Sequence, residues 1–192
     1  MKNIKKIKLS ICIATMNRAN YLKQLLDIII SQYQDNIELV IVDGASTDNT
    51  YDVIVAAQMK ISNIKYIRLK EKGGVDRDFS HAVCKAKGEF CWLLPDDDLI
   101  KPEAIKNILF MINKNTNLII INAEIWSKDM CFLLASQTVK IKKNKEYNRE
   151  NFNNFFISFS SHLSFIGSIV IRKSVWDQRQ KQKYFGSWFV HV

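Results

Sequence analysis

Short apolar runs alternate along the chain with segments in which apolar side chains recur at helical spacing. A helix brings residues three and four positions apart onto one face, whereas a strand of a covered sheet is apolar along its length. Strands and helices that alternate in this way indicate βαβ units and an α/β fold with a mostly parallel sheet. The pattern predicts strands at 8–14, 37–42, 64–69, 89–94 and 118–126, and helices at 21–29, 48–59, 79–87 and 102–113.

Local features refine this pattern at the ends of the regular runs. Gly88 suits the position after the third helix, where glycine adopts a left-handed conformation at little cost. Pro102 and Glu103 are typical of the first turn of a helix, since that turn leaves its amide hydrogens unpaired in any case. Residues 127–151 are polar and lysine-rich, so we expect a loop or a loose hairpin there, followed by a further strand-like run at 166–171.

The composition is that of a globular protein with a positive charge. The 192 residues fit one domain, and 47% hydrophobic residues can bury a core, which excludes a wholly disordered chain. Lys and Arg outnumber Asp and Glu by 28 to 19, for a formal charge of +9. This charge favours nucleic acid, a phospholipid surface or a phosphorylated small molecule as a partner, unless it reflects only a lysine-rich solvated surface. No helix-turn-helix, zinc-finger or RNP-like pattern supports nucleic acid.

The cysteines and the N-terminal segment bear on the compartment. Cys12, Cys84, Cys91 and Cys131 form no C-x-x-C pair and lie in apolar runs, so we interpret them as reduced core residues of a cytoplasmic protein without zinc. Lysines followed by a short apolar run resemble a signal peptide, but no small-residue cleavage site follows, and a buried strand explains the run better. No apolar run reaches the ~18 residues that a membrane span requires.

Polar residues follow four of the predicted strands at the point where each strand ends. Thr15 and Asn17 come after the first strand, Asp43 after the second, residues 73–77 after the third, and residues 96–98 after the fourth. In a parallel sheet with right-handed crossovers, these positions share the edge outside the carboxyl ends of the strands, where open α/β sheets bind ligands. We therefore expect a ligand site at this edge.

The three successive carboxylates of Asp96, Asp97 and Asp98 would repel one another if left bare. A divalent cation removes this repulsion, and an all-oxygen site suits Mg²⁺ or Mn²⁺ with substrate phosphates completing the ligands. The alternative is a surface turn whose carboxylates cap the following helix. Because the three aspartates share their edge with the other polar positions, we favour the metal site.

Three stretches of the sequence resemble the signature stretches of family 2 glycosyltransferases with the GT-A fold. They are SICIATMNR at 10–18, VDGASTDNT at 42–50 and KGEFCWLLPDDD at 87–98. The combination of GVDR at 74–77 with WLLPDDD at 92–98 is similar to the abequosyltransferase-like branch, which builds bacterial surface polysaccharide. The resemblance covers residues 9–113 well and the rest weakly. It implies a Rossmann-like, mostly parallel sheet with helices on both faces and a nucleotide-sugar site at the carboxyl edge of the strands.

The resemblance also implies roles for individual residues, while the base and the donor sugar stay open. Asp97 and Asp98 would hold Mg²⁺ or Mn²⁺, which would act as a Lewis acid on the leaving diphosphate. Arg77 suits a phosphate through its fork of donors. Thr15, Asn17 and Asp43 would surround the base and ribose, Asp76 and Arg77 would lie over the nucleotide sugar, Asp96 would face the ribose or the sugar, and Arg18 belongs to the same substrate-binding set.

The acceptor side carries fewer signals. Inverting members of the family need a general base, usually acidic, late in the domain, and no Glu-Asp pair follows Phe165. His191 is our candidate for the catalytic base or an extra metal ligand, against the plainer alternative of a structural or solvated histidine. We expect one domain overall, with a self-contained donor half at 1–126 and a partial acceptor half at 127–192. The apolar end of the sequence favours a fragment of a longer protein.

Motifs and resemblance together predict a metal-dependent glycosyltransferase of bacterial surface polysaccharide synthesis. Its partners would be a nucleotide-diphosphate sugar and a glycan or lipid-linked acceptor, without nucleic acid. We expect a cytoplasmic location with peripheral contact to the anionic inner face of the membrane. The alternatives are a nucleotide-sugar binding fragment without efficient turnover, a basic membrane or nucleic-acid module, and a sugar-phosphate nucleotidyltransferase. The last should carry a glycine-rich basic loop after the first strand, where this chain has ATMN at 14–17.

Overall fold

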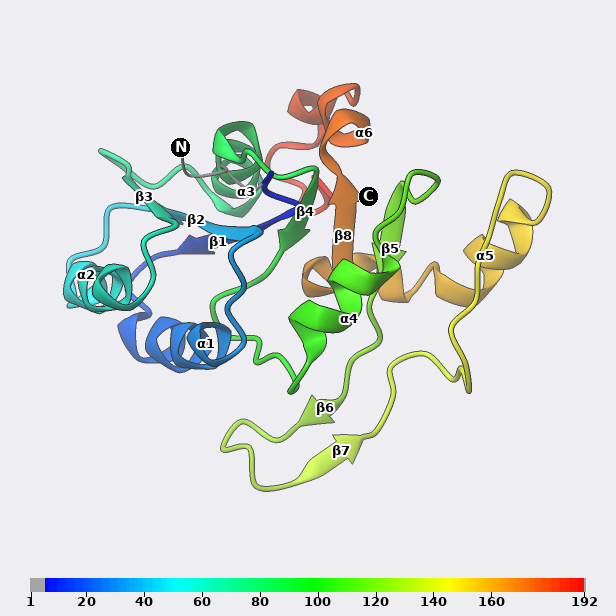
Figure 1. The fold of residues 1–192 in the computed structure, drawn as a ribbon, viewed down its shortest axis with the longest axis horizontal. Helices are drawn as coiled ribbons and strands as arrows, with labels where there is room; N and C mark the ends of the chain where they lie inside the picture. The colour runs from blue at the N-terminus through cyan, green and yellow to red at the C-terminus, as the bar shows by residue number, and fades with distance from the viewer. Residues whose placement is uncertain (1–5, 192) are drawn as a thin grey trace.

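The computed structural model describes residues 6–191 and is built around a six-stranded sheet (Figure 1). Its strands are β1 (Leu9–Thr15), β2 (Ile37–Asp43), β3 (Ile64–Arg68), β4 (Phe90–Leu93), β5 (Leu118–Ile120) and β8 (Ile169–Arg172), in the order β3-β2-β1-β4-β8-β5. The first four strands are parallel to one another, and β8 runs antiparallel to both of its neighbours. The mostly parallel sheet predicted from the alternating pattern is confirmed.

Helices cover both faces of this sheet. One face carries α1 (Ala19–Ser31), α2 (Thr50–Lys60) and α4 (Ala104–Met111), and the other carries α3 (Val75–Lys85) and the short α6 (Lys173–Asp177) (Figure 1). Because side chains alternate across a strand, each strand supplies both layers. In β1, Ile11 and Ile13 pack in the core beneath α1, whereas Cys12 packs in the core beneath α3. The sheet is therefore the middle of three layers.

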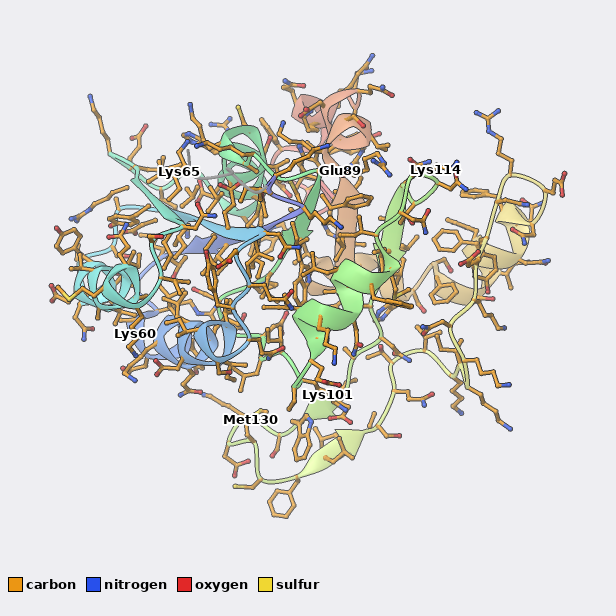
Figure 2. All side chains as sticks on the ribbon, in the orientation of Figure 1. Lys60, Lys65, Glu89, Lys101, Lys114 and Met130 are labelled. Carbon is orange, nitrogen blue, oxygen red and sulfur yellow. The ribbon has the colours of Figure 1, made fainter. Side chains whose placement is uncertain are left out.

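The chain after β5 differs from the single strand expected at 118–126. The strand ends at Ile120, and the side-chain amide of Asn122 then donates to the carbonyl of Val139 (2.7 Å) and accepts from the amide of the same residue (3.0 Å). The chain then forms a separate hairpin of β6 (Ile125–Trp126) and β7 (Leu133–Ala135). Figure 2 shows Met130 at the turn of this hairpin, away from the six-stranded sheet. A loose hairpin is thus present, starting slightly before the expected segment.

β8 comes from far along the chain and inserts between β4 and β5. Ile171 pairs with Cys91 on one side and with Leu118 on the other. The expectation that residues up to 126 form a self-contained sheet is therefore wrong, because β8 is the sheet neighbour of β5. The helix α5 (Phe152–Phe159) precedes β8 in the sequence and lies to the side of the main body in Figure 1.

Gly88 has a different role from the one expected. The third helix ends at Lys85, with Ala86 extended after it, so Gly88 does not close the helix. A β-carbon on Gly88 would lie 2.5 Å from Ser10 Oγ, and the Gly88 amide donates to that oxygen at 2.8 Å. Ser10 in turn donates to the buried carboxylate of Glu38 at 2.6 Å. Glycine is required here because the backbone passes directly against β1.

Two further expectations are corrected by the structure. α4 begins later than expected, after Glu103, which adopts a left-handed conformation with φ of 62°. Cys12 and Cys91 are buried as expected, but Cys84 on α3 and Cys131 in the β6–β7 hairpin are exposed. Across residues 6–191, no helix is both long and apolar enough to cross a membrane.

Candidate functional site

Side chains join the ends of β1 and β4. In the parallel ladder Cys12 pairs with Leu93, so the residues that continue the two strands stay in step. Thr15 Oγ1 donates a hydrogen bond of 2.6 Å to Oδ2 of Asp96, and both residues are buried. The sequence placed these two residues at the same edge of the sheet, and the structure brings them into contact.

Arg18 lies between two of the three successive aspartates. Its Nη1 is 3.2 Å from Asp96 Oδ1, and its Nη2 is 2.6 Å from Asp97 Oδ2. The guanidinium also lies 5.0 Å from the centre of the Tyr21 ring. Burial lowers the pKa of Arg18, but the hydrogen bond to Asp97 and the charge of Asp96 outweigh it and raise the pKa. A fixed positive charge therefore stands at the edge of the sheet, in a form suited to phosphate oxygens.

Asp98 has a buried carboxylate oxygen without a hydrogen-bond partner among the described residues, namely Oδ2. The backbone of Gly167 lies against it, since a β-carbon on that glycine would be 2.5 Å from the oxygen. Burial, followed by the charges of Asp97 and Asp96, raises the pKa of Asp98 to about 7. Burial also raises the pKa of Asp96. The three carboxylates are thus close enough for their charges to act on one another.

The oxygen atoms of this cluster fit a divalent cation. A buried, unpartnered carboxylate oxygen beside two further carboxylates is costly, and a cation would supply the missing contact and cancel the repulsion. Within residues 6–191, no group of three or more His, Cys, Asp or Glu side chains is arranged to hold a metal. The carboxylates of this cluster that could hold such an ion are those of Asp97, which is exposed, and Asp98, which has the unpartnered oxygen.

The loop after β2 is organised around the carboxylate of Asp43. Oδ1 accepts from the amide of Ser46 (2.8 Å), and Oδ2 accepts from the hydroxyl of Tyr66 (2.7 Å). Ser46 Oγ accepts from the amide of Asn17 (2.9 Å), and its carbonyl accepts from Arg68 (2.7 Å). Burial and the hydrogen bond to Asp43 raise the pKa of Tyr66. The loops after β1 and β2 are therefore one connected unit.

Asp43 is buried inside this unit, so its carboxylate orders the loop from within. Asn17 adopts a positive φ of 54°, and its Oδ1 accepts from the amide of Thr47 at 2.7 Å, which ties the exposed Asn17 side chain to the loop after β2. Tyr66 and Arg68 were not predicted from the sequence. Their signal was available, because two polar residues spaced two apart near the end of a strand point to the same side.

Asp76 lies in the first turn of α3, and the chain itself occupies both of its oxygens. Oδ2 accepts from the amides of Gly186 (2.8 Å) and Trp188 (2.9 Å), and Oδ1 accepts from the amide of Val190 (3.1 Å). The residue is 4% exposed. The carboxylate that the resemblance placed over the nucleotide sugar therefore binds the backbone of residues 186–190 in this structure.

Arg77 and His191 also have their described contacts near the end of the chain rather than with the three aspartates. The Arg77 guanidinium lies 5.8 Å from the centre of the Phe185 ring. His191 is buried, with Nε2 2.9 Å from the carbonyl oxygen of Leu163. Burial lowers the pKa of His191. The structure thus brings together Thr15, Arg18, Asp96 and Asp97 in one group, and Asp76 with the 185–191 segment in another.

Comparison with known proteins relates this arrangement to sugar transfer enzymes. Residues 10–177 match the family described as Glycosyl transferase family 2. The abequosyltransferase RfbV of Salmonella typhimurium is 27% identical over 96% of this chain, and the chain spans 59% of that relative's length.

Solved structures share the fold. The crystal structure of S. aureus TarS 1-349 in complex with UDP superposes with a TM-score of 0.71 at 20% identity, over 96% of this chain and 53% of that one. The mannosyltransferase PcManGT from Pyrobaculum calidifontis, in complex with GDP-Man and Mn²⁺, superposes with a TM-score of 0.61 at 16% identity, over 89% of this chain and 46% of that one. At such identities the likeness concerns the fold alone, which is that of GT-A glycosyltransferases.

Proposed function

The chain belongs to glycosyl transferase family 2, and from this premise we propose that it transfers a sugar from a nucleoside diphosphate donor to a glycan or lipid-linked acceptor in bacterial surface polysaccharide synthesis. The observation that carries the proposal is the group at the joined ends of β1 and β4, where Thr15 and Arg18 meet Asp96 and Asp97. A relative named as an abequosyltransferase and a structural neighbour bound to UDP support sugar transfer from such a donor.

We assign the donor diphosphate to the edge beside Arg18 and Asp97. Asp97 and Asp98 would hold Mg²⁺ or Mn²⁺, and the chemistry that the ion supplies is Lewis-acid stabilisation of the leaving diphosphate. The buried oxygen of Asp98 without a described partner supports this assignment, as does the Mn²⁺ of the mannosyltransferase neighbour. Arg18 would exchange its carboxylate partners for phosphate oxygens, which its planar fork fits equally well.

The nucleoside would lie along the connected loops after β1 and β2. Asp43 holds the second loop rigid from inside, and Asn17 joins it to the first, so the loop backbone is ordered before the ligand arrives. Asp96, fixed by Thr15, would face the ribose or the sugar. We assign Arg77 to the sugar side of the donor.

We propose His191 as the base that accepts the proton of the acceptor hydroxyl. A carbonyl oxygen can only accept, so Nε2 carries the ring hydrogen toward Leu163 and Nδ1 keeps its lone pair. That buried Nδ1 has no hydrogen-bond partner among the described residues, and the lowered pKa favours the neutral ring that a base requires. His191→Gln should lower transfer by about 100-fold while UDP binding stays unchanged. Equal transfer by the variant would remove the histidine from the reaction.

We also propose that the protein acts in the cytoplasm, at the inner face of the membrane. The formal charge of +9 supports contact with anionic lipid. The β6–β7 hairpin also exposes Met130, Phe132 and Leu134, and exposed lysines follow it at 140–145. Apolar side chains flanked by lysines suit the boundary between headgroups and acyl chains.

A binding screen followed by a transfer assay tests the proposed function. Thermal unfolding should shift upward with one of UDP, CDP, GDP or dTDP in the presence of Mn²⁺. Release of nucleoside diphosphate that depends on an added glycan would show transfer, whereas binding without release would favour a nucleotide-sugar binding protein. Release of pyrophosphate from a nucleoside triphosphate and a sugar phosphate would instead show a nucleotidyltransferase. No binding of any nucleotide would contradict all three.

A further inference from the structure

The segment 185–190, here called the Asp76 loop, is wrapped around a single buried carboxylate. Alternate amides, those of Gly186, Trp188 and Val190, converge on Asp76. Hydrogen bonds from backbone amides to an ionised carboxylate are stronger than those between neutral groups. Side-chain burial adds to this anchor, because Val190 is completely buried in the core beneath α3. The loop is therefore held at a defined place on the first turn of α3.

The backbone of the Asp76 loop adopts a rare conformation. Gly186 has φ of 90°, and Trp188 has φ of 69°, a value that is uncommon for a residue with a bulky side chain. With positive φ at Gly186 and Trp188, the amides of alternate residues face one side and form a concave site for an anion. The Asp76 carboxylate fills that site. The conformation of Trp188 is thus maintained by its contact with Asp76 rather than by local preference.

Trp188 is presented outward by this arrangement. Its side chain is 70% exposed, the largest value among the four tryptophans of the chain, since Trp92 and Trp176 are buried and Trp126 is 39% exposed. An exposed indole leaves a large apolar surface in water, which has a cost unless a ligand covers it. A strained, anchored backbone that presents an exposed indole is typical of a ligand-binding loop rather than of a loose surface loop.

The Asp76 loop lies beside the edge of the sheet that carries the donor groups. On one side, the first turn of α3 approaches the end of β2, where a β-carbon on Gly44 would be 3.5 Å from Asp78 Oδ2. On the other side, His191 contacts Leu163, in the same short segment as Gly167, whose backbone backs onto Asp98. The elements that hold the Asp76 loop, α3 and the segment 163–167, therefore reach the Asp43 end and the Asp98 end of this edge.

We propose that Trp188 binds a pyranose ring by stacking and that Asp76 is the positioning residue that presents it. The C–H face of a pyranose is flat and apolar, and it matches the face of an indole. This inference rests on the proposed function. It gives Asp76 an indirect role, the positioning of Trp188, in place of a direct contact with the nucleotide sugar. The ring belongs either to the donor or to the acceptor, and both have the same chemistry at this surface.

Tryptophan fluorescence tests the proposal in the full chain. If the ring belongs to the donor, UDP-glucose or UDP-galactose should shift the tryptophan emission of the wild-type protein, and UDP alone should not. Methyl pyranosides added in the presence of UDP should shift it if the ring is the acceptor's. Trp188→Ala should abolish the shift and weaken sugar binding about fivefold at unchanged UDP affinity, the size of one aromatic stacking contact. Trp126→Ala is the matched control and should change neither.

Asp76→Asn tests the positioning role. It should make Trp188 more accessible to acrylamide and reproduce the fivefold loss of sugar affinity, with UDP affinity unchanged. Gly186→Ala strains the loop without touching the carboxylate and should give the same result, so it serves if Asp76→Asn does not fold. Loss of UDP affinity in Asp76→Asn with unchanged Trp188 emission would overturn the proposal in favour of a direct nucleotide contact.

The proposed function and the stacking role of Trp188 can be rejected independently. If no nucleotide binds the wild-type protein, the proposed function is wrong, and acrylamide quenching of Asp76→Asn still decides whether Asp76 anchors the loop. If nucleotides bind but no sugar probe alters Trp188 emission, the stacking role is overturned while the proposed function stands.

Discussion

The hydroxyl of Thr15 donates a hydrogen bond to the carboxylate of Asp96 across 81 positions of sequence, with 2.6 Å between the two oxygens. This contact belongs to Asp96 alone, and the three consecutive aspartates have three different environments. Asp96 is buried and hydrogen-bonded, Asp97 is exposed and paired with Arg18, and Asp98 is half-buried with one oxygen lacking a described partner. The acidic run is therefore not a uniform patch of charge, and each position should respond differently to substitution.

Removing the Thr15 hydroxyl should destabilise the protein. In Thr15→Val the shape is kept, but buried Asp96 loses a donor, which should cost about 1 to 3 kcal/mol in the free energy of unfolding measured with urea. Thr15→Ser keeps the hydroxyl and is the matched control, with most of the stability retained. Equal stability of the wild-type and valine proteins would show that the contact adds nothing.

Asp97→Asn should abolish metal-dependent nucleotide binding without unfolding the protein, because the side chain is exposed and supports no core packing. In the wild-type protein, nucleoside diphosphate at 100 times its Kd with Mn²⁺ should add about 2.7 kcal/mol of apparent stability, and EDTA should remove it. Asp52→Asn, at an exposed position of α2, is the control. Normal Mn²⁺-dependent affinity in folded Asp97→Asn would place the metal elsewhere.

Gly167→Ala should disturb the acidic run through the backbone. The added carbon would lie 2.5 Å from Asp98 Oδ2, so the carboxylate or the chain must shift, at a cost of roughly 1 to 3 kcal/mol by thermal unfolding. Combining the change with Asp98→Ala should recover part of this loss. Gly44→Ala, where the nearest atom would be at 3.4 Å, should be milder. An additive double variant would exclude the clash with Asp98.

The pH dependence of stability should carry a contribution from Asp78. Burial raises its pKa to about 6; Lys72 acts to lower it and the charge of Asp43 to raise it. The folded protein then holds a proton that the unfolded chain releases near pH 4, so this contribution is complete below that pH and is lost as the pH rises through about 6.

In Asp78→Asn this contribution is absent, so melting temperature should change less between pH 4 and 7 than in the wild-type protein. At pH 7 to 8 the variant should be at least as stable as the wild type, because no buried charge forms. Asp52→Asn provides the comparison at an exposed carboxylate. Parallel curves for the wild-type and Asp78→Asn proteins would contradict the assignment.

Binding to anionic vesicles should depend on salt. Each lysine near a surface rich in phosphatidylserine contributes about 1 kcal/mol, and this attraction falls off within a Debye length. Replacing Lys140, Lys142, Lys143 and Lys145 by Gln should therefore reduce sedimentation with such vesicles at low salt. Binding that ignores both salt and these substitutions would reject electrostatic attachment through this segment.

The first four strands and their helices were predictable because their signal is local. Apolar runs and helical spacing lie within each element, and right-handed crossovers then determine the shared edge on which Thr15, Asp43 and Asp96 lie. The place of β8 was not predictable in the same way. The run 166–171 indicates a strand but carries no mark of its partners, and its insertion beside β4 depends on packing across the whole sheet.

The candidate site, like the fold, was predictable from the sequence only in part. The acidic run was visible because three adjacent carboxylates are unusual in themselves. The anchoring of Asp76 was not, because its partners are backbone amides more than one hundred positions away, and an amide has no sequence signature. Gly88 was misassigned for a related reason, since the close approach of Ser10 that excludes a side chain there is a tertiary contact.

The insertion of β8 sets an order of events during synthesis. Once β4 has left the ribosome, the parallel ladder β3-β2-β1-β4 has all of its members. β5 is made next but has no strand to pair with until Arg172 has emerged, and until then its backbone hydrogen-bonding groups and the outer edge of β4 stay open. This delay is a window for mispairing, and non-local closure makes the step slow. The outer edge of β4 and the whole of β5 are therefore the parts of the nascent sheet that stay unpaired longest. They are where the nascent chain most needs protection against mispairing.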